Sequence, residues 1–392
     1  MSRVGVVTPW YPSEGSVYLG SFVEQQVEAV RSLGWHVDVE VLQLFPSPDR
    51  SVPDEVIDAM ERLADRDDEA LYRRYRGATW IPAPVPVGGG AFGRVEAFAA
   101  ALERKRRRLP VDVDVVHAHL GVPVGAALLG LDSHPLVVTE HQSTLASVLA
   151  ERPARGAYGE VVRRAARFFV VSEHLATLIV DAVGSWAADR IEVMPNIVDL
   201  SDIERRERAS VGRRWLYVGA LIRTKGVREL VEAFLSYRKR YDTEATLTLV
   251  GAGAERAWIE HTLGEADALD AVDLVGSVPR AQLGPYLDRA DVYVHLSPAE
   301  TFGIASLEAI GAGLPVVSFA NGGAEAAWGS IEAQAGRILD SGADPGEVAD
   351  AVAGLGSGRE LDPVAARAFV EQHYSVAAVG QRLIDVYTEA QR

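Results

Sequence analysis

Short apolar segments alternate with amphipathic helical segments along most of this chain, and this alternation constrains the fold more than any other feature. Residues 4–8 (VGVVT) predict a buried strand, residues 21–34 an amphipathic helix, and residues 36–44 a second strand. A strand, a helix and a strand in succession form a unit whose strands are parallel. The sequence therefore predicts an α/β fold built on parallel sheets.

The alternation occurs in two series, which predicts two doubly wound domains. We expect the first over residues 1–205 and the second over residues 206–374, with the polar segment 201–214 as a linker. Residues 375–392 predict a terminal helix that packs back on the first domain. Residues 46–95, with a charged helical piece and a Pro/Gly-rich loop, are interpreted as an irregular insertion. A length of 392 residues agrees with two domains.

Composition limits the chemistry and the partners. The chain has no cysteine, which excludes disulfides, thiolate metal sites and a cysteine nucleophile. Its net charge of −16 argues against a general affinity for nucleic acid. No apolar run approaches the ~18 residues of a membrane span, and the first residues lack a signal-peptide core, so we expect a cytoplasmic protein. The basic segment 104–108 (RKRRR) is either a solvated helix end or a patch for a phosphorylated acceptor or for anionic lipid at the inner membrane face.

Residues 297–317 (SPAETFGIASLEAIGAGLPVV) combine a strand end, a helix start and two glutamates. A helix N-terminus that begins at a glycine favours an anion such as phosphate. A carboxylate next to it, Glu300, is suited to accept hydrogen bonds from sugar hydroxyls, and Glu308 could accept a pair from a ribose diol. The alternative to a binding site is that Glu300 is only a carboxylate favoured at a helix start and that Glu308 is a surface residue. The backbone expected to hold the phosphate belongs to Thr301, Phe302, Gly303 and Ile304.

A second loop in the same half repeats this pattern. A strand predicted in the segment RWLYVGA ends at Gly219, and Arg223 and Lys225 lie in the loop before the next helix. The two cations could neutralise a pyrophosphate. The alternative is a pair of solvated loop residues. Loops of this kind follow the carboxyl ends of parallel strands, where α/β sheets bind ligands.

Three histidines lie at the ends of predicted strands of the first half. His117 and His119 end the segment VVHAH, and the period of two places them on the same face, while His141 ends the predicted strand LVVTEH. A histidine at the carboxyl end of a strand is placed for acceptor contact or proton transfer. The alternative for each one is a satisfied, partly buried histidine.

Two further patterns imitate known sites. Asp112 and Asp114 form a D-x-D pair, but they precede a strand at its N-terminal end, which is the wrong end for a site. Residues 250–256 (VGAGAER) resemble the start of a dinucleotide fingerprint but lack its third glycine, so they predict a turn. No cluster of metal ligands has a convincing spacing, and we expect no metal site.

Taken together, these segments make the chain similar to the retaining glycosyltransferases of family 4, which have the GT-B fold. The most specific features are the two glutamates separated by seven residues, the A-x-G-x-P-V-V-like run and the G-G-x-x-E-like run. The resemblance implies two Rossmann-like domains facing across a cleft, the first for an acceptor and the second for a nucleotide sugar. The segments that carry it include DVVHAH, VVTEH, VVSEHL, VMPNIVD, YVGALIRTKG, SPAETFGIASLEAIGAGLPVV and NGGAEAAW.

The resemblance also implies roles for single residues. Glu300 matches the contact to the donor sugar, Glu308 the contact to the ribose and Lys225 the phosphate-binding lysine. The family usually has an arginine where this chain has Ala220, and Arg223 could supply the missing charge. Further matches are Gly20 near phosphate and acceptor, His141 near sugar and acceptor, Val278 along the nucleobase, and Gly303 and Ile304 at the diphosphate.

The implied activity is transfer of a sugar from a nucleotide-diphosphate donor, by default a UDP-sugar, to a hydroxyl of a glycan, a lipid-linked glycan or a natural product. The resemblance implies retention of configuration and no metal ion. Glu300, Lys225 and His141 are the expected catalytic residues, with His117 and His119 also on the acceptor side. Two alternatives stay open, a nucleotide-sugar epimerase of the same fold and a non-catalytic protein that binds the nucleotide sugar.

Overall fold

The chain forms two compact units in the computed structural model, Met1–Pro195 with Val379–Arg392, and Asn196–Ala378. The sequence predicts the boundary between the domains after residue 205. In the structure the first unit ends at Pro195, so residues 196–204 belong to the second unit. Each unit is described by itself. The structure describes residues 2–12, 19–47, 77–86, 90–108, 112–131, 134–204, 212–356 and 361–392.

The first unit contains a seven-stranded parallel sheet in the order β3-β2-β1-β4-β5-β6-β7. The order reverses between β1 and β4, and sheets of this type bind ligands at such a point. Both β4 and β5 are buried along their whole length, as expected of parallel strands covered on both faces. The strands are Arg3–Thr8 (β1), His36–Ser47 (β2), Ala78–Pro86 (β3), Val115–His119 (β4), Leu136–Glu140 (β5), Arg167–Val170 (β6) and Ile191–Val193 (β7).

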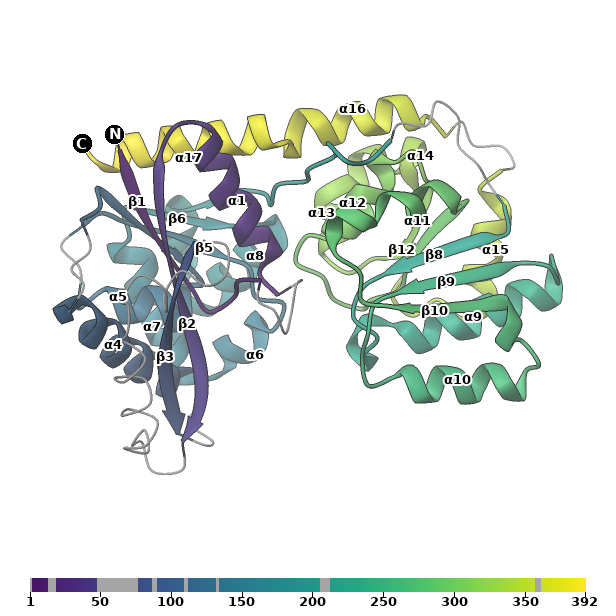
Figure 1. Cartoon of the computed structure of the whole chain (residues 1–392), viewed down its shortest axis with the longest axis horizontal. Coiled ribbons are helices and arrows are strands. Elements are labelled where there is room, and N and C mark those ends of the chain that lie inside the picture. Colours follow the sequence, from purple (N-terminus) through teal and green to yellow (C-terminus); the bar gives the residue numbers. More distant parts are fainter. Residues whose placement is uncertain are drawn as a thin grey trace. The chain divides into compact units, whose positions relative to one another are not determined.

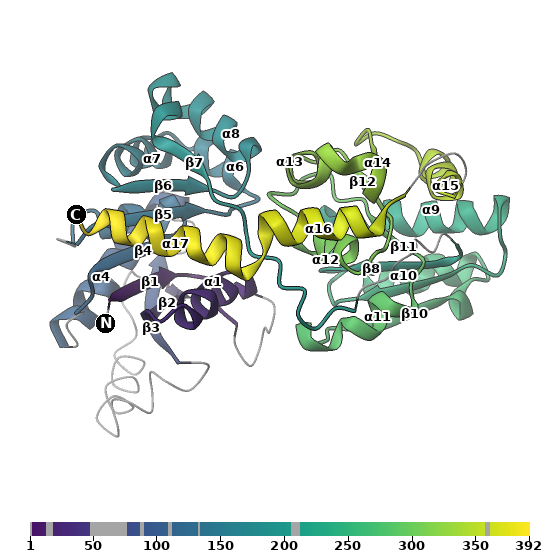
Figure 2. The same cartoon turned by 90° about the horizontal axis from the view of Figure 1, so that it is seen from above.

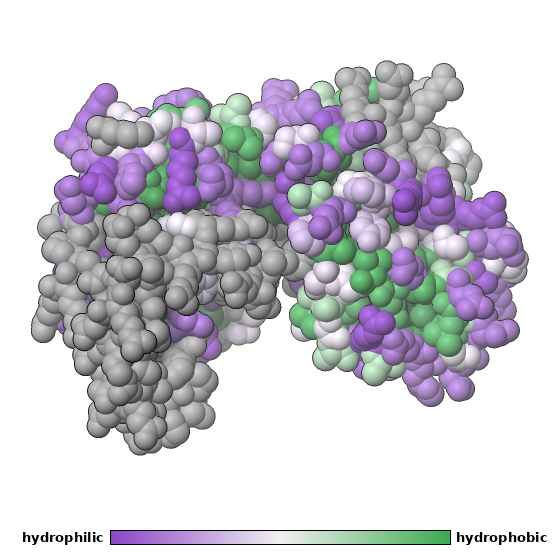
Figure 3. Space-filling model, viewed as in Figure 1, coloured by the Kyte–Doolittle hydropathy of each residue, from purple (hydrophilic) through white to green (hydrophobic). Residues whose placement is uncertain are grey.

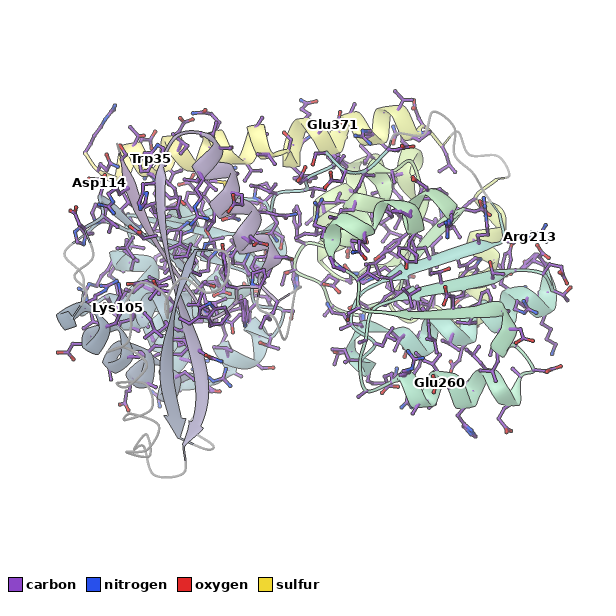
Figure 4. The ribbon with its side chains drawn as sticks, viewed as in Figure 1. Trp35, Lys105, Asp114, Arg213, Glu260 and Glu371 are labelled. Carbon is purple, nitrogen blue, oxygen red and sulfur yellow. The ribbon has the colours of Figure 1, made fainter. Side chains whose placement is uncertain are left out.

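Helices cover this sheet, and the terminal helix α17 lies beside α1 (Figures 1 and 2). Gly380 of α17 packs so closely that an added Cβ would lie 3.2 Å from Cβ of Ala29. The rings of Trp35 and Tyr387 are 5.5 Å apart, with Trp35 next to α17 (Figure 4). The helices are Ser21–Ser32 (α1), Gly90–Arg108 (α4), Ala126–Leu128 (α5), Leu145–Ala150 (α6), Arg152–Arg164 (α7), Glu173–Val183 (α8) and Val376–Ala390 (α17).

The segment interpreted as an irregular insertion contains regular structure. Residues 78–86 form β3, which pairs in parallel with β2 from Val39↔Ala78 to Ser47↔Pro86. The expectation of irregular structure is therefore wrong for β3 and for the first residues of α4. The three prolines of β3 agree with its place at the edge of the sheet, where one side of the strand has no neighbour to receive an N–H group. The charged helical piece expected at 54–76 lies outside the described residues.

The second unit contains a six-stranded parallel sheet in the order β10-β9-β8-β11-β12-β13. Its order reverses between β8 and β11. The two doubly wound parallel sheets predicted from the alternation are thus confirmed. The strands are Arg214–Val218 (β8), Thr246–Val250 (β9), Val272–Gly276 (β10), Val292–His295 (β11), Val316–Phe319 (β12) and Gly336–Leu339 (β13).

Helices α9 and α10 lie on one face of the second sheet, and α12 and α13 lie on the other (Figure 1). Hydrophobic side chains gather on the surface that carries the edge strand β10, where Val272 and Leu274 are half-buried (Figure 3). None of the helices in the described part of the chain combines the length and apolarity that a membrane span needs. The helices are Val227–Arg240 (α9), Arg256–Glu265 (α10), Gly284–Arg289 (α11), Ile304–Gly311 (α12), Gly323–Trp328 (α13), Glu332–Ala335 (α14), Pro345–Gly354 (α15) and Pro363–Tyr374 (α16).

Candidate active site

Two loops meet where the order of the second sheet reverses. The loop after β8 ends in a 3-10 turn at Arg223–Lys225, and the loop after β11 carries Glu300. Gly226, which directly precedes α9 and has φ at +68°, allows the two loops to touch. A Cβ at this glycine would lie 1.8 Å from the carbonyl oxygen of Leu296, so a side chain cannot replace the hydrogen.

The carboxylate of Glu300 has two partners at this junction. Nζ of Lys225 donates to its Oε1 at 2.6 Å, and Nε2 of His295 donates to the same oxygen at 3.0 Å. Burial opposes ionisation of Glu300, but the attraction of His295 and then of Lys225 outweighs it and lowers the pKa of Glu300 to about 2. Glu300 is therefore an anion at neutral pH, next to a cation.

The first turn of α12 lies directly after this carboxylate. Gly303 caps the helix with φ at +86°, and its carbonyl oxygen accepts from the N–H groups of Ser306 and Leu307. The N–H groups before them have no acceptor within a helix, so an anion is favoured here. The ring of Phe302 is buried edge-on against Tyr374 at 5.2 Å, which leaves only its backbone for a ligand.

The segment NGG after β12 supports Glu300 from the other side. The N–H of Glu300 donates to the carbonyl oxygen of Asn321 at 3.0 Å. The side chain of Asn321 accepts from the N–H groups of Gly323 and Ala324 at 3.1 and 2.9 Å. A Cβ at Gly323 would lie 2.9 Å from Cβ of Glu300, so this glycine is required for the close approach.

Glu308 is buried, with 5% of its surface exposed, which excludes the alternative of a surface glutamate. Its Oε1 accepts from Nε of Arg280 at 2.8 Å, and Arg280 also donates to the backbone oxygen of Asp199. Burial raises the pKa of Glu308 above its usual value, although Arg280 opposes the rise. The sequence reasoning missed Arg280, because a single arginine in a loop forms no pattern.

Arg223 lies apart from the Lys225–Glu300 pair. Its side chain is 55% exposed and pairs with Glu229 of α9 at 2.6 Å. Ala220 is exposed, and its carbonyl oxygen accepts from the hydroxyl of Tyr217 at 3.0 Å. Arg223, which was expected to replace the missing arginine, is therefore ion-paired with Glu229 in this structure.

The glycines of the VGAG run have a packing role. A Cβ at Gly251 would lie 1.8 Å from the carbonyl oxygen of Gly219, and one at Gly253 would lie 2.1 Å from that of Leu221. The turn therefore packs against the loop that leads to Lys225. Val278, expected along a nucleobase, lies in the segment after β10 and is 8% exposed.

In the first unit, the reversal point between β1 and β4 brings together Gly20, His119 and His141. Nδ1 of His119 and Nε2 of His141 are 2.9 Å apart, and the ring of His141 packs on Phe22 at 4.6 Å. Gly20 precedes Phe22 with φ at +76° and approaches the backbone of Trp10, where a Cβ would lie at 2.2 Å.

His117 has a different environment from the other two histidines. Its Nδ1 lies 2.7 Å from the hydroxyl of Tyr387, and its Nε2 lies 2.8 Å from Oγ1 of Thr139. Burial lowers the pKa of His117 to about 3, so the ring is neutral. Both ring nitrogens form hydrogen bonds inside the protein, so in this structure neither is available to contact an acceptor substrate.

Glu140 is a second residue that the sequence reasoning missed. Its fully buried carboxylate accepts from the N–H groups of Gly121, His141 and Gln142 at 2.9, 2.8 and 2.7 Å, and from the hydroxyl of Tyr158 at 2.5 Å. Burial raises the pKa of Glu140, and these hydrogen bonds oppose the rise. The carboxylate fixes the turn that carries His141. The signal in the sequence was an acid at the end of an apolar strand.

The charged segments outside these sites pair within the first unit. Lys105 on α4 (Figure 4) and Arg106 both contact the buried carboxylate of Glu40, Arg106 at 3.5 Å. The other side chains of 104–108 lie outside the described ones. The D-x-D pair binds Arg3, through Asp112 at 3.3 Å and Asp114 at 2.8 Å. Among the described side chains, no group of three or more histidine or acidic residues could hold a metal ion.

Comparison with known families matches both halves of the chain. The family model described as Glycosyltransferase Family 4 matches residues 20–202, and the one described as Glycosyl transferases group 1 matches residues 202–367. A 2-deoxystreptamine glucosyltransferase of Streptomyces kanamyceticus is 31% identical over 265 residues, which are 60% of this chain and 67% of that protein.

Other relatives are matched over a smaller share of their length. D-inositol 3-phosphate glycosyltransferases of Pseudarthrobacter chlorophenolicus and Paenarthrobacter aurescens are 31% and 33% identical over 59% and 62% of this chain. The matches span 60% and 64% of those two proteins.

Solved structures share the fold at low identity. A sucrose-phosphate synthase from Thermosynechococcus elongatus superposes with a TM-score of 0.76 at 20% identity, covering 99% of each chain. Anabaena HepE in complex with UDP gives a TM-score of 0.68 at 16% identity, covering 99% of this chain and 100% of that one.

Proposed function

We propose, because the chain belongs to the family-4 glycosyltransferases with their GT-B fold, that it transfers a sugar from a nucleoside-diphosphate donor to a hydroxyl acceptor. The contact between Lys225 and Glu300 at the start of α12 carries this proposal. A sugar phosphate offers an anion next to several hydroxyls. A cation, helix N–H groups and an ionised carboxylate complement those groups.

The diphosphate is the proposed ligand of Lys225 and of the backbone at residues 301–304. Negative charge develops on the diphosphate as the bond to the sugar breaks, and fixed donors at that position lower the barrier. Lys225 is 29% exposed on its side chain, so phosphate oxygens can reach it. The two phosphates would then compete with Glu300 for the ammonium group.

The two glutamates are proposed to bind hydroxyls. No described residue donates to Oε2 of Glu300, since Lys225 and His295 both use Oε1. That second oxygen is therefore available to the hydroxyls of the donor sugar. Glu308 likewise has Oε1 engaged by Arg280, which leaves its Oε2 for a ribose hydroxyl.

In the proposed reaction the acceptor hydroxyl attacks the anomeric carbon from the face that the diphosphate leaves. The bond from carbon to phosphate oxygen breaks, the bond to the acceptor oxygen forms, and a diphosphate oxygen takes the proton. Retention follows from this geometry without a carboxylate nucleophile. We propose that Gly20 and His141 line the acceptor side, and that no metal ion is needed because Lys225 and α12 supply the positive charge.

A UDP-sugar is the first donor to test, because a solved neighbour binds UDP and one relative is a glucosyltransferase. The experiment is a thermal-shift panel of UDP, GDP and ADP with their glucose conjugates. One nucleoside diphosphate is expected to raise the melting temperature, since a ligand at 100 times its Kd stabilises by about 2.7 kcal/mol. Lys225→Ala should lose most of that shift. A panel in which no diphosphate stabilises the wild-type protein contradicts the proposal.

A further inference from the structure

His295 is the last residue of β11 and contacts Glu300 of the candidate site. Its side chain is 8% exposed, and its ring lies parallel to those of Tyr217 at 5.8 Å and Tyr293 at 6.2 Å. The hydroxyl of Tyr217 donates to the carbonyl oxygen of Ala220 at 3.0 Å, and that of Tyr293 donates to Val218 at 3.2 Å. The imidazole is therefore packed against two rings that are themselves held in place.

Among the described residues, the one polar contact of this ring is to Glu300. An ionised carboxylate can only accept, so the hydrogen in the 3.0 Å contact is on Nε2 of His295. Nδ1 of His295 is buried and has no partner among the described residues. A buried polar side chain at the end of a core strand costs free energy unless it is hydrogen-bonded, and this one gives its hydrogen bond to the proposed sugar-binding carboxylate.

The two partners of Glu300 differ in how firmly they are held. Lys225 ends in an ammonium group on a long chain, 29% exposed, whereas His295 is a buried ring. A bound diphosphate would attract Lys225 away from Glu300, because its charge is higher than that of one carboxylate. Glu300 then keeps only His295 of its two side-chain partners.

We propose that His295 is a positioning residue, which holds Oε1 of Glu300 while Lys225 moves to the diphosphate. Oε2 of Glu300 then stays directed at the sugar hydroxyls throughout the reaction. This inference rests on the proposed function and deepens it: recognition of the sugar depends on His295, and recognition of the nucleoside diphosphate does not.

The pKa of Glu300 also depends on its contact with His295. His295 and Lys225 lower the pKa of Glu300, and the charge of Glu300, after burial, contributes to raising the pKa of Tyr217 and of Tyr293. Loss of the histidine should raise that pKa. The acid limb of a pH–rate profile that requires ionised Glu300 should then move to higher pH.

Three substitutions separate the hydrogen bond from the packing. His295→Phe keeps an aromatic ring and removes the donor. His295→Gln places an amide nitrogen near the position of Nε2, whereas His295→Asn places one near Nδ1. We expect kcat/KM for the donor sugar to fall about 10²-fold in the Phe and Asn variants, as for a misplaced catalytic group, and to recover in part in the Gln variant.

The matched measurement is binding of the nucleoside diphosphate alone, by calorimetry with UDP, GDP and ADP. Its Kd should stay within about twofold of wild type in all three variants, because Lys225 is intact. If His295→Phe and His295→Asn transfer sugar like the wild type while Lys225→Ala does not, the inference is overturned and the proposed function stands. Failure of the wild-type protein to bind any diphosphate contradicts the proposed function instead.

A titration of Glu300 tests the contact without a substrate. Carboxyl carbons of glutamates labelled with ¹³C are followed by NMR, and Glu300 is assigned as the signal missing in Glu300→Gln. The carboxyl of Glu300 should titrate at higher pH in His295→Phe than in the wild type. An unchanged titration overturns the inference, whatever the donor is.

Discussion

Lys225→Ala is expected to lower kcat/KM for sugar transfer by about 10²–10³-fold, the usual cost of removing one fixed donor from a developing oxyanion. Lys225 contacts Glu300, which lies just before α12, whereas Arg223 pairs with Glu229 at 2.6 Å. No second side chain among the described residues of these loops therefore takes over its charge. The effect is measured from initial rates over a range of donor concentrations.

The control for this variant is Lys239→Ala, which removes an exposed lysine from the same helix, α9. That variant should keep kcat/KM within about twofold, since an isolated surface charge contributes little. Lys225→Arg keeps the charge and should lose less than Lys225→Ala. Wild-type kcat/KM in Lys225→Ala would mean that the leaving group does not bind at this loop.

Glu140→Ala is expected to cause the largest loss of stability, about 3–5 kcal/mol, because it leaves several buried donors without an acceptor. These donors are three backbone N–H groups and the hydroxyl of Tyr158, all of them on one carboxylate. Glu140→Gln keeps the shape and one acceptor oxygen and should lose less. The free energy of unfolding is measured by denaturant titration of the transition of the first unit, since two units need not unfold together.

Glu173→Ala is the matched control, because Glu173 is an exposed acid at the start of α8 in the same unit. We expect it to change stability by less than about 1 kcal/mol. If Glu140→Ala is as stable as Glu173→Ala, the carboxylate network does not hold the turn that carries His141.

The alternation of strands and helices was enough to predict both sheets, because parallel strands buried on two faces are continuous apolar runs. It failed at β3. The segment ATWIPAPVP contains three prolines, which in sequence favour a loop, and only its place at the sheet edge makes it a strand. Position in a sheet is a tertiary property that a local pattern does not contain.

The sequence placed Lys225 and Glu300 in loops that each follow a predicted strand of the second half, where parallel sheets bind ligands. The structure brings these two loops together where the strand order reverses. The partners of these side chains were not predictable. His295 reads as the last residue of a core strand, and the choice of Arg223 between a phosphate and Glu229 depends on the path of the turn. Contacts of this kind need the folded backbone.

The most direct test of the site compares Glu300→Gln with the wild type in two assays, calorimetric titration of the nucleoside diphosphate and transfer of the sugar. We expect the diphosphate to bind at least as tightly as to the wild type, because Lys225 and the start of α12 are intact and Glu300 no longer competes for the ammonium group, while kcat/KM for transfer falls by about 10²-fold or more. A Glu300→Gln variant that transfers sugar with near wild-type kcat/KM would contradict the assignment of the site.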